Sequence, residues 1–259
     1  GTLTIIGNGT GNTIISGNNA RRVFWQSNGA LTLQSLTVRD GNADVGGAMY
    51  IGGDVTLNNV AFINNSAVEA GAIVADTNGN VTITASVFEG NTAVHRAGAL
   101  FINQSSTNII INSLFVNNTA DTYGGAINQT DGTLTIINST FSGNTADYGT
   151  ITTSNGGTTA TLRNSIVANT MGGGTDCLAN FGGTLNVEYS LCESGMSFVT
   201  GTITESITGD PFLDANYQLT NFSLAINAGS DDFVLDIDYD LAGNSRIQQG
   251  RVDMGAYES

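Results

Sequence analysis

The segment DDFVLDIDYDLAGN (residues 231–244) is rich in side chains that could bind a metal ion. Asp236, Asp238 and Asp240 alternate, so in a strand their carboxylates would share one face and repel one another. A bound Ca²⁺ would relieve that repulsion, because calcium takes carboxylate and amide oxygens as ligands. The spacing therefore predicts a calcium site formed by Asp236, Asp238, Asp240 and Asn244.

A solvated acidic loop is the alternative interpretation of this segment. The glycine and the terminal glutamate of an EF-hand loop are not in place. In such a loop, Asp240 or Asp253 would pair with Arg246 instead of binding a cation. The sequence leaves both interpretations open, and it predicts no cofactor other than calcium.

Acidic residues elsewhere raise the question of carbohydrate cleavage. A polysaccharide lyase needs a base and usually a cation, and a hydrolase needs two or three carboxylates at one bond. The chain has no lysine, its seven arginines are scattered, and most acidic residues of its central part fall in turns. The sequence therefore predicts no catalytic residue, and a polysaccharide lyase or hydrolase is kept as the alternative to a non-enzymatic protein.

Two cysteines, Cys177 and Cys192, stand 15 residues apart in loop-rich surroundings. A disulfide closing a loop of this length would contribute ~3 kcal/mol in the chain-entropy model. The alternative is a pair of buried free thiols in a reducing compartment. We expect the disulfide.

The elements that must position these residues come from an internal repeat. VTLNNVAFINN at Val55 and VTITASVFEGN at Val81 are two of its copies. The copies start at positions 31, 55, 81, 108, 134, 160 and 185, which are separated by 24, 26, 27, 26, 26 and 25 residues. Insertions of one or two residues are therefore absorbed in turns while a common register is kept.

Each copy contains three short strand-like stretches. An alternating apolar stretch comes first, a second apolar stretch and an Asn-rich turn follow, and a small-residue strand such as AGAL ends the copy. Such a unit cannot bury a face alone, but stacked units bury a continuous core. The pattern predicts an all-β fold, a right-handed parallel β-helix of 24–27 residues per rung with an irregular C-terminal cap. With strands ~4.8 Å apart, we expect roughly eight to ten rungs.

When the rungs stack, residues at equivalent positions of successive copies form columns. Aromatic rings inside a β-helix pack the core, and asparagine amides can hydrogen-bond between turns and tolerate left-handed backbone. The sequence predicts structural ladders of Phe62, Phe88, Phe115 and Phe141 and of Asn65, Asn91, Asn118 and Asn144.

A third column lies on the outward face of the first strand, at Thr32, Thr56, Thr82, Ile109 and Thr135. Threonines at rung spacing on a flat β-helix face match the geometry of ice binding, although threonine suits any solvated sheet face. An ice-binding face is a minor alternative function.

The repeat divides the chain into three parts. Residues 1–30 form the first rung or rungs, residues 31–192 form the regular rungs, and residues 193–259 form the cap. A cap is expected because a bare final rung exposes a sheet edge. The chain opens at Gly1 without methionine. We therefore expect a mature or trimmed fragment, whose first rung is covered by preceding chain or by another subunit.

Two motifs alternate in phase along the repeats. FINN (62–65), FEGN (88–91), FVNN (115–118) and FSGN (141–144) alternate with GGAM, AGAI, AGAL and GGAI. This pattern resembles the passenger region of polymorphic outer-membrane proteins. The terminal segment, which ends in GAYE before Ser259, is similar to that of bacterial surface-anchored β-helix proteins with a variable C-terminal anchor. The resemblance implies a secreted or surface-displayed β-helix of adhesive or structural function, and it implies no catalytic residues.

The composition of the chain disfavours some classes of binding partner. A net charge of −15 disfavours nucleic acid and anionic membrane surfaces. No stretch approaches the ~20 apolar residues of a membrane span. We expect an extracellular or cell-surface bacterial protein that is structural or adhesive and that binds a protein, a glycan or copies of itself.

Overall fold

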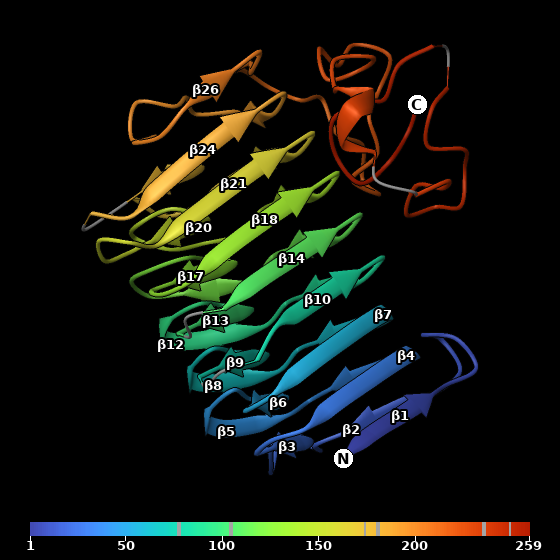
Figure 1. Cartoon of the computed structure of the whole chain (residues 1–259), viewed down its shortest axis with the longest axis vertical. Helices are drawn as coiled ribbons and strands as arrows, with labels where there is room; N and C mark the ends of the chain where they lie inside the picture. Colours follow the sequence, from blue (N-terminus) through green and yellow to red (C-terminus); the bar gives the residue numbers. More distant parts are fainter. Residues whose placement is uncertain (77–78, 104–105, 174, 180–181, 235–236, 249) are drawn as a thin grey trace.

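The repeats stack into a parallel β-helix (Figure 1). The structure is a computed structural model that describes residues 1–76, 79–103, 106–173, 175–179, 182–234, 237–248 and 250–259. Successive rungs lie one above another for about seven turns, from the N-terminal strand β1 (Thr2–Ile6) to β26 (Ile203–Thr204). The predicted all-β fold and its parallel β-helix are confirmed, with about seven turns where the sequence predicted roughly eight to ten.

Three parallel sheets form the walls of the coil within the described residues. Sheet A contains fifteen strands, which lie on both sides of the first corner of each rung. Before this corner lie β1, β4 (Ala30–Arg39), β7 (Asp54–Ile63), β10 (Val81–Thr84), β14 (Thr107–Ile111), β18 (Thr133–Ile137), β21 (Thr159–Arg163), β24 (Thr184–Glu188) and β26. After it lie β2 (Ile14–Ser16), β11 (Val87–Glu89), β15 (Leu114–Val116), β19 (Thr140–Ser142), β22 (Ile166–Ala168) and β25 (Leu191–Cys192), while β4 and β7 run through the corner.

Sheets C and B complete each rung in that order. In the described part of the chain, sheet C consists of β5 (Asn42–Val45), β8 (Ser66–Glu69), β12 (Thr92–Arg96) and β16 (Thr119–Ala120). Sheet B consists of β3 (Phe24–Gln26), β6 (Met49–Ile51), β9 (Ile73–Ala75), β13 (Leu100–Ile102), β17 (Ile127–Gln129), β20 (Ile151–Thr153) and β23 (Cys177–Ala179).

Strand pairing keeps the spacing of the sequence repeat. Leu31 pairs with Val55, and Val55 pairs with Val81. The later rungs pair with offsets of 27, 26, 26 and 25 residues. Because strand side chains alternate, this register sends Val55 and Leu57 into the core and leaves Thr56 exposed.

The first corner is held by a column of serines that the sequence did not predict. Its members are Ser86, Ser113, Ser139, Ser165, Ser190 and Ser206. Each hydroxyl accepts the backbone N–H of the preceding rung, as in the bond from Ser113 N to Ser139 Oγ (3.1 Å). The residue before each serine adopts a left-handed backbone, as at Asn112 and Asn138.

The third corner, between sheets C and B, has no room for side chains. A Cβ atom on Gly71 or Gly98 would overlap the carbonyl oxygen of the glycine one rung further on. The residues before them, Ala70 and Ala97, have left-handed φ angles of 59° and 58°. This sharp turn reverses the chain and brings the outer surfaces of the two sheets toward each other.

The predicted cap, residues 193–259, consists of two structurally different parts. Met196 and Val199 pack against the end of the core. Beyond Ile207, which pairs with Leu191, the chain leaves the coil and includes the 3₁₀ helix Asp231–Phe233. Figure 1 shows this C-terminal segment beside the upper rungs.

The C-terminal segment is attached to the first corner of several rungs. Asn112 Nδ2 donates to the carbonyl oxygen of Tyr239 (3.1 Å), and Asn164 Nδ2 donates to that of Ser230 (2.8 Å). The N–H of Ala256 donates to Thr140 Oγ1 at 2.9 Å. The segment therefore supports the side of the solenoid over successive rungs.

Candidate functional site

The four phenylalanines of the predicted ladder stack inside the coil. Phe62, Phe88, Phe115 and Phe141 are fully buried, and successive ring centroids are 5.0, 4.4 and 4.7 Å apart. The rings fill the core and fix the register between rungs. They present no surface to a ligand.

The four asparagines Asn65, Asn91, Asn118 and Asn144 form a buried hydrogen-bonded column at the second corner. The Nδ2 of each of the first three donates to the Oδ1 of the next asparagine at 2.9 Å. Each of these Oδ1 atoms also accepts the backbone N–H of the previous asparagine at 3.0 Å. The left-handed backbone at this corner belongs to the preceding residue, as at Asn64 and Gly90, and not to the ladder asparagine itself.

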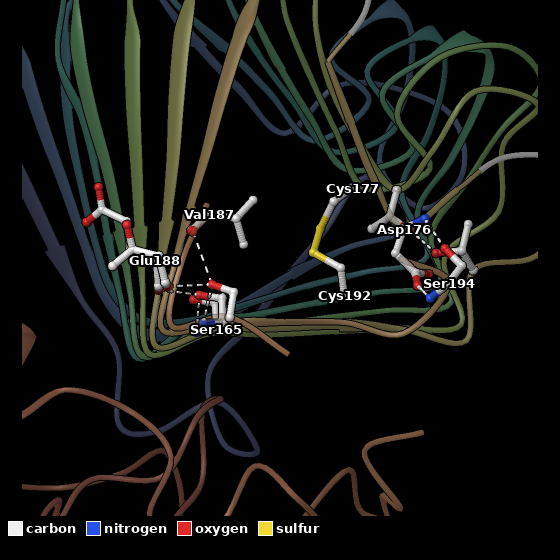
Figure 2. Close-up of a disulfide and its surroundings, with 12 residues drawn as sticks. Ser165, Asp176, Cys177, Val187, Glu188, Cys192 and Ser194 are labelled. Atoms are coloured by element: carbon white, nitrogen blue, oxygen red, sulfur yellow. Dashed lines mark hydrogen bonds between the residues drawn. A yellow bond between two sulfur atoms is a disulfide. The ribbon is translucent and has the colours of Figure 1, made fainter. Parts of the chain in front are cut away.

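Cys177 and Cys192 form a buried disulfide inside the coil, as predicted (Figure 2). The bond joins β23 of sheet B to β25 of sheet A, and so links two walls of the last rungs. Beside it, the backbone N–H of Asp176 donates to Ser194 Oγ (2.9 Å), and the N–H of Ser194 donates to Asp176 Oδ2.

The predicted calcium ligands have different surroundings. Asp236 lies outside the described residues, and Asp238 is exposed. Asp240 is buried, and its oxygens accept the backbone N–H of Asn244 (2.7 Å), the side-chain amide of Asn244 (3.0 Å) and the N–H of Glu258 (2.9 Å). In the part of the chain that the structure describes, no three His, Cys, Asp or Glu residues are placed to hold a metal ion. Calcium binding stays a prediction.

Arg246 organises the interior of the C-terminal segment. Its side chain is 1% exposed, lies 3.3 Å from the carboxylate of Glu258 and donates to the carbonyl oxygen of Gly255. With the Asn138 amide oriented to satisfy its neighbours, the Asn138 oxygen accepts from Arg246 Nε at 2.9 Å. The arginine therefore connects the end of the chain to a corner of the solenoid.

Burial has the largest effect on the pKa values of Glu258 and Arg246. It raises the pKa of Glu258 to about 8, although Arg246 and the N–H of Asp253 act in the opposite direction. The carboxylates of Asp253 and Asp240 add to the rise. Burial also lowers the pKa of Arg246, which the three surrounding carboxylates oppose.

The outer side of the third corner, which we name the re-entrant face, combines aromatic, arginine and amide side chains. Val74 and Phe101 point outward from sheet B, yet they are only 1% and 4% exposed and pack with Ala70 and Ala97. The outer surfaces of sheets B and C therefore meet at an inward angle. The face comprises Trp25, Tyr50, Val74, Phe101, Asn128 and Thr152 from sheet B, and Arg22, Val45, Glu69, Arg96, Tyr123 and Tyr148 before the corner.

Aromatic rings on the re-entrant face stack along the solenoid axis. Trp25 stacks on Tyr50 with ring centroids 4.6 Å apart. Tyr123 stacks on Tyr148 at 5.0 Å, and Tyr148 remains 45% exposed. The two residues of each pair are register partners, so each stack joins two neighbouring rungs.

Two arginines lie against these aromatic residues. The Arg22 guanidinium lies 4.8 Å from the Trp25 ring centroid and donates to the carbonyl oxygen of Gly46. The Arg96 guanidinium lies 4.9 Å from the ring of Phe101 and 2.9 Å from Glu69. Both cations are therefore held in place by ring and oxygen contacts.

A row of polar side chains follows sheet B at the rim of the face. Tyr50 donates to Asp76 (3.3 Å), and Asn103 Nδ2 donates to the other oxygen of Asp76 (2.7 Å). Thr130 Oγ1 donates to Asn103 Oδ1 (2.7 Å), and Asn155 Nδ2 donates to the carbonyl oxygen of Thr130 (3.0 Å). Burial, followed by the charge of Asp76, raises the pKa of Tyr50, while burial lowers the pKa of Arg22. The row crosses five rungs, from β6 to β20, and its hydrogen bonds fix the side chains that it contains.

A depression of about 270 Å³ lies between this row and the aromatic stack. None of the described residues that line it carries a carboxylate. The lining residues are Arg96, Asn103, Tyr123, Asn128, Thr130, Ser154 and Asn155.

A larger depression of about 760 Å³ lies at the second corner of the last rungs. Asp176 and Glu193, the residues that flank the disulfide, both line it. Each carboxylate accepts a backbone N–H, from Ser194 and from Asn169 respectively. The disulfide thus brings two carboxylates to one hollow.

Sequence reasoning did not identify the re-entrant face. A signal was present, because Tyr50 and Phe101 directly follow the small-residue motifs GGAM and AGAL, and Tyr148 begins the corresponding stretch YGTI (148–151). The predicted threonine column is in register and extends from Thr4 to Thr161, so ice binding also stays a prediction.

Comparison with known proteins does not assign the chain to a family. The chain matches no protein-family model, and no curated protein is significantly similar to it. Among the described residues, no helix is long and apolar enough to cross a membrane.

Proposed function

We propose that this chain is a secreted or cell-surface structural module of adhesive type, related to bacterial surface-anchored β-helix proteins. The observation that carries the proposal is the re-entrant face, where aromatic, arginine and amide side chains repeat along the axis. Aromatic residues and arginine are enriched where proteins bind partners. The predicted ladders, in contrast, are buried and serve the architecture of the coil.

The proposed location rests on two features. Disulfides persist in oxidising compartments, and this chain contains the Cys177–Cys192 bond. The in-phase F-x-x-N and G-G-A-I motifs resemble those of surface-displayed passengers. A protein, a glycan or another copy of the chain would bind along several rungs, and nucleic acid is disfavoured by the net charge of −15.

Bead adhesion tests the proposal. Beads coated with the protein are passed over bacterial and epithelial cell layers, beside beads coated with albumin. We expect retention that the double variant Arg96→Ala, Tyr148→Ala reduces at least fivefold. Tyr239→Ala is the matched control, because Tyr239 is also exposed (61%) but lies in the C-terminal segment. Retention no greater than that of albumin on every layer would contradict adhesion.

A polysaccharide hydrolase is the second candidate, and the hollow at Asp176 and Glu193 favours it. Hydrolases of this kind use two carboxylates on either side of one glycosidic bond. Reducing sugars released from a polysaccharide panel, and lost in Glu193→Gln, would support the enzyme. Equal release by wild type and variant would exclude this hollow as the active site.

A further inference from the structure

We propose that the depression beside Tyr123 on the re-entrant face is a binding subsite for an uncharged glycan, a chain of neutral hexoses. This inference rests on the proposed adhesive function, because it names the chemical class of the partner. The depression lies in the middle of the solenoid and is lined by residues of three successive rungs.

The lining has the groups that recognise sugar hydroxyls. Asn103, Asn128 and Asn155 carry amides with two N–H donors and one acceptor each, and Thr130 and Ser154 carry hydroxyls that both donate and accept. The bonds to Asp76 and to Thr130 use one N–H of Asn103 and of Asn155. Among the described atoms, each of these two amides thus has a second N–H for a ligand.

Further hydrogen bonds of the lining residues make the site rigid. Asn128 Nδ2 donates to Thr152 at 2.7 Å, and Thr130 donates to Asn103 at 2.7 Å. The amides are therefore oriented before any ligand arrives, which lowers the entropy cost of binding.

An aromatic platform lies next to these polar groups. Tyr123 lines the depression and stacks on Tyr148, whose ring is 45% exposed. Sugar rings have apolar C–H faces, and they pack on aromatic rings while their hydroxyls bond to the amides. One aromatic pair and one amide row side by side match both surfaces of a hexose.

The charges in the depression and on the whole chain favour a neutral glycan over a charged ligand. Among the described residues of the lining, Arg96 is the only one with a charged side chain, and Glu69 balances its charge at 2.9 Å. A polyanionic glycan would be repelled by the net charge of −15. A cationic peptide would find no carboxylate among the lining residues that the structure describes.

Titration with neutral hexaoses tests the inference. The intact chain, labelled with ¹⁵N, is titrated with cellohexaose, maltohexaose and mannohexaose, and with polygalacturonate hexamer and oligolysine as charged probes. We expect amide shifts at residues 96–103 and 123–130 with at least one neutral hexaose. We expect Tyr148→Ala to weaken that binding about tenfold, while Tyr239→Ala leaves it unchanged.

The outcomes separate this inference from the adhesive function. Shifts that occur only with the acidic hexamer or with oligolysine would overturn the neutral glycan. Binding of a neutral hexaose that Tyr148→Ala does not weaken would overturn the site. If the beads adhere through this face but no neutral hexaose binds, the inference fails while the adhesive function stands.

Discussion

Removing one amide from the middle of the asparagine column should destabilise the whole solenoid. Asn118 makes four buried hydrogen bonds, two from Asn91 to its Oδ1 and two from its Nδ2 to the carbonyl oxygen of Phe88 and to Asn144. Each buried bond contributes ~1 kcal/mol, so Asn118→Ala should lower the free energy of unfolding by about 4 kcal/mol. For a chain of this size, that corresponds to roughly 10 °C in Tm.

Urea unfolding followed by far-ultraviolet circular dichroism measures this change. Asn58→Ala is the matched control, because Asn58 is an exposed asparagine on β7 of the same solenoid. The control should stay within about 0.5 kcal/mol of wild type. If Asn118→Ala is no more destabilising than Asn58→Ala, the column does not hold the rungs together and the reasoning is wrong.

Three further predictions concern the end of the chain. Replacing both Cys177 and Cys192 with serine should lower the free energy of unfolding by ~3 kcal/mol in urea, and an unchanged midpoint would contradict the cross-link. The pKa of Glu258, raised from 4.5 to about 8, means that its contribution to stability is fully present below pH 4.5 and is lost as the pH rises through 8. Tm should therefore fall over this range in wild type and fall less in Glu258→Gln, whereas equal slopes would refute the assignment. Isothermal titration with Ca²⁺ up to millimolar concentrations should show binding that Asp238→Asn weakens, and no heat of binding would exclude the calcium site.

The coil could be predicted because the alternating apolar residues of each repeat set the register between rungs. Val55, Val81 and their equivalents lie in the core, at the same offsets that separate the copies of the repeat in the sequence. The cysteine pair was predictable for the same reason, since the repeat placed both residues in adjacent rungs.

The re-entrant face was harder to predict from the sequence, because it depends on the direction of a turn and not on the period of the repeat. Tyr50 and Phe101 look like core residues in a small-residue strand. Only the left-handed corner at Ala70 and Ala97 shows that the outer sides of two sheets face each other. The 3.3 Å contact of Arg246 with Glu258, in place of a pairing with Asp240 or Asp253, depends likewise on how an aperiodic segment returns to the first corner.

Charge insertion on two faces tests the central claim most directly. Tyr148→Glu places a carboxylate on the re-entrant face, and Thr56→Glu places one on the outward face of β7. Bead retention on the same cell layers should be lost in Tyr148→Glu and kept in Thr56→Glu. Retention that survives Tyr148→Glu and disappears in Thr56→Glu would show that the chain binds its partner through the threonine column and not through the re-entrant face.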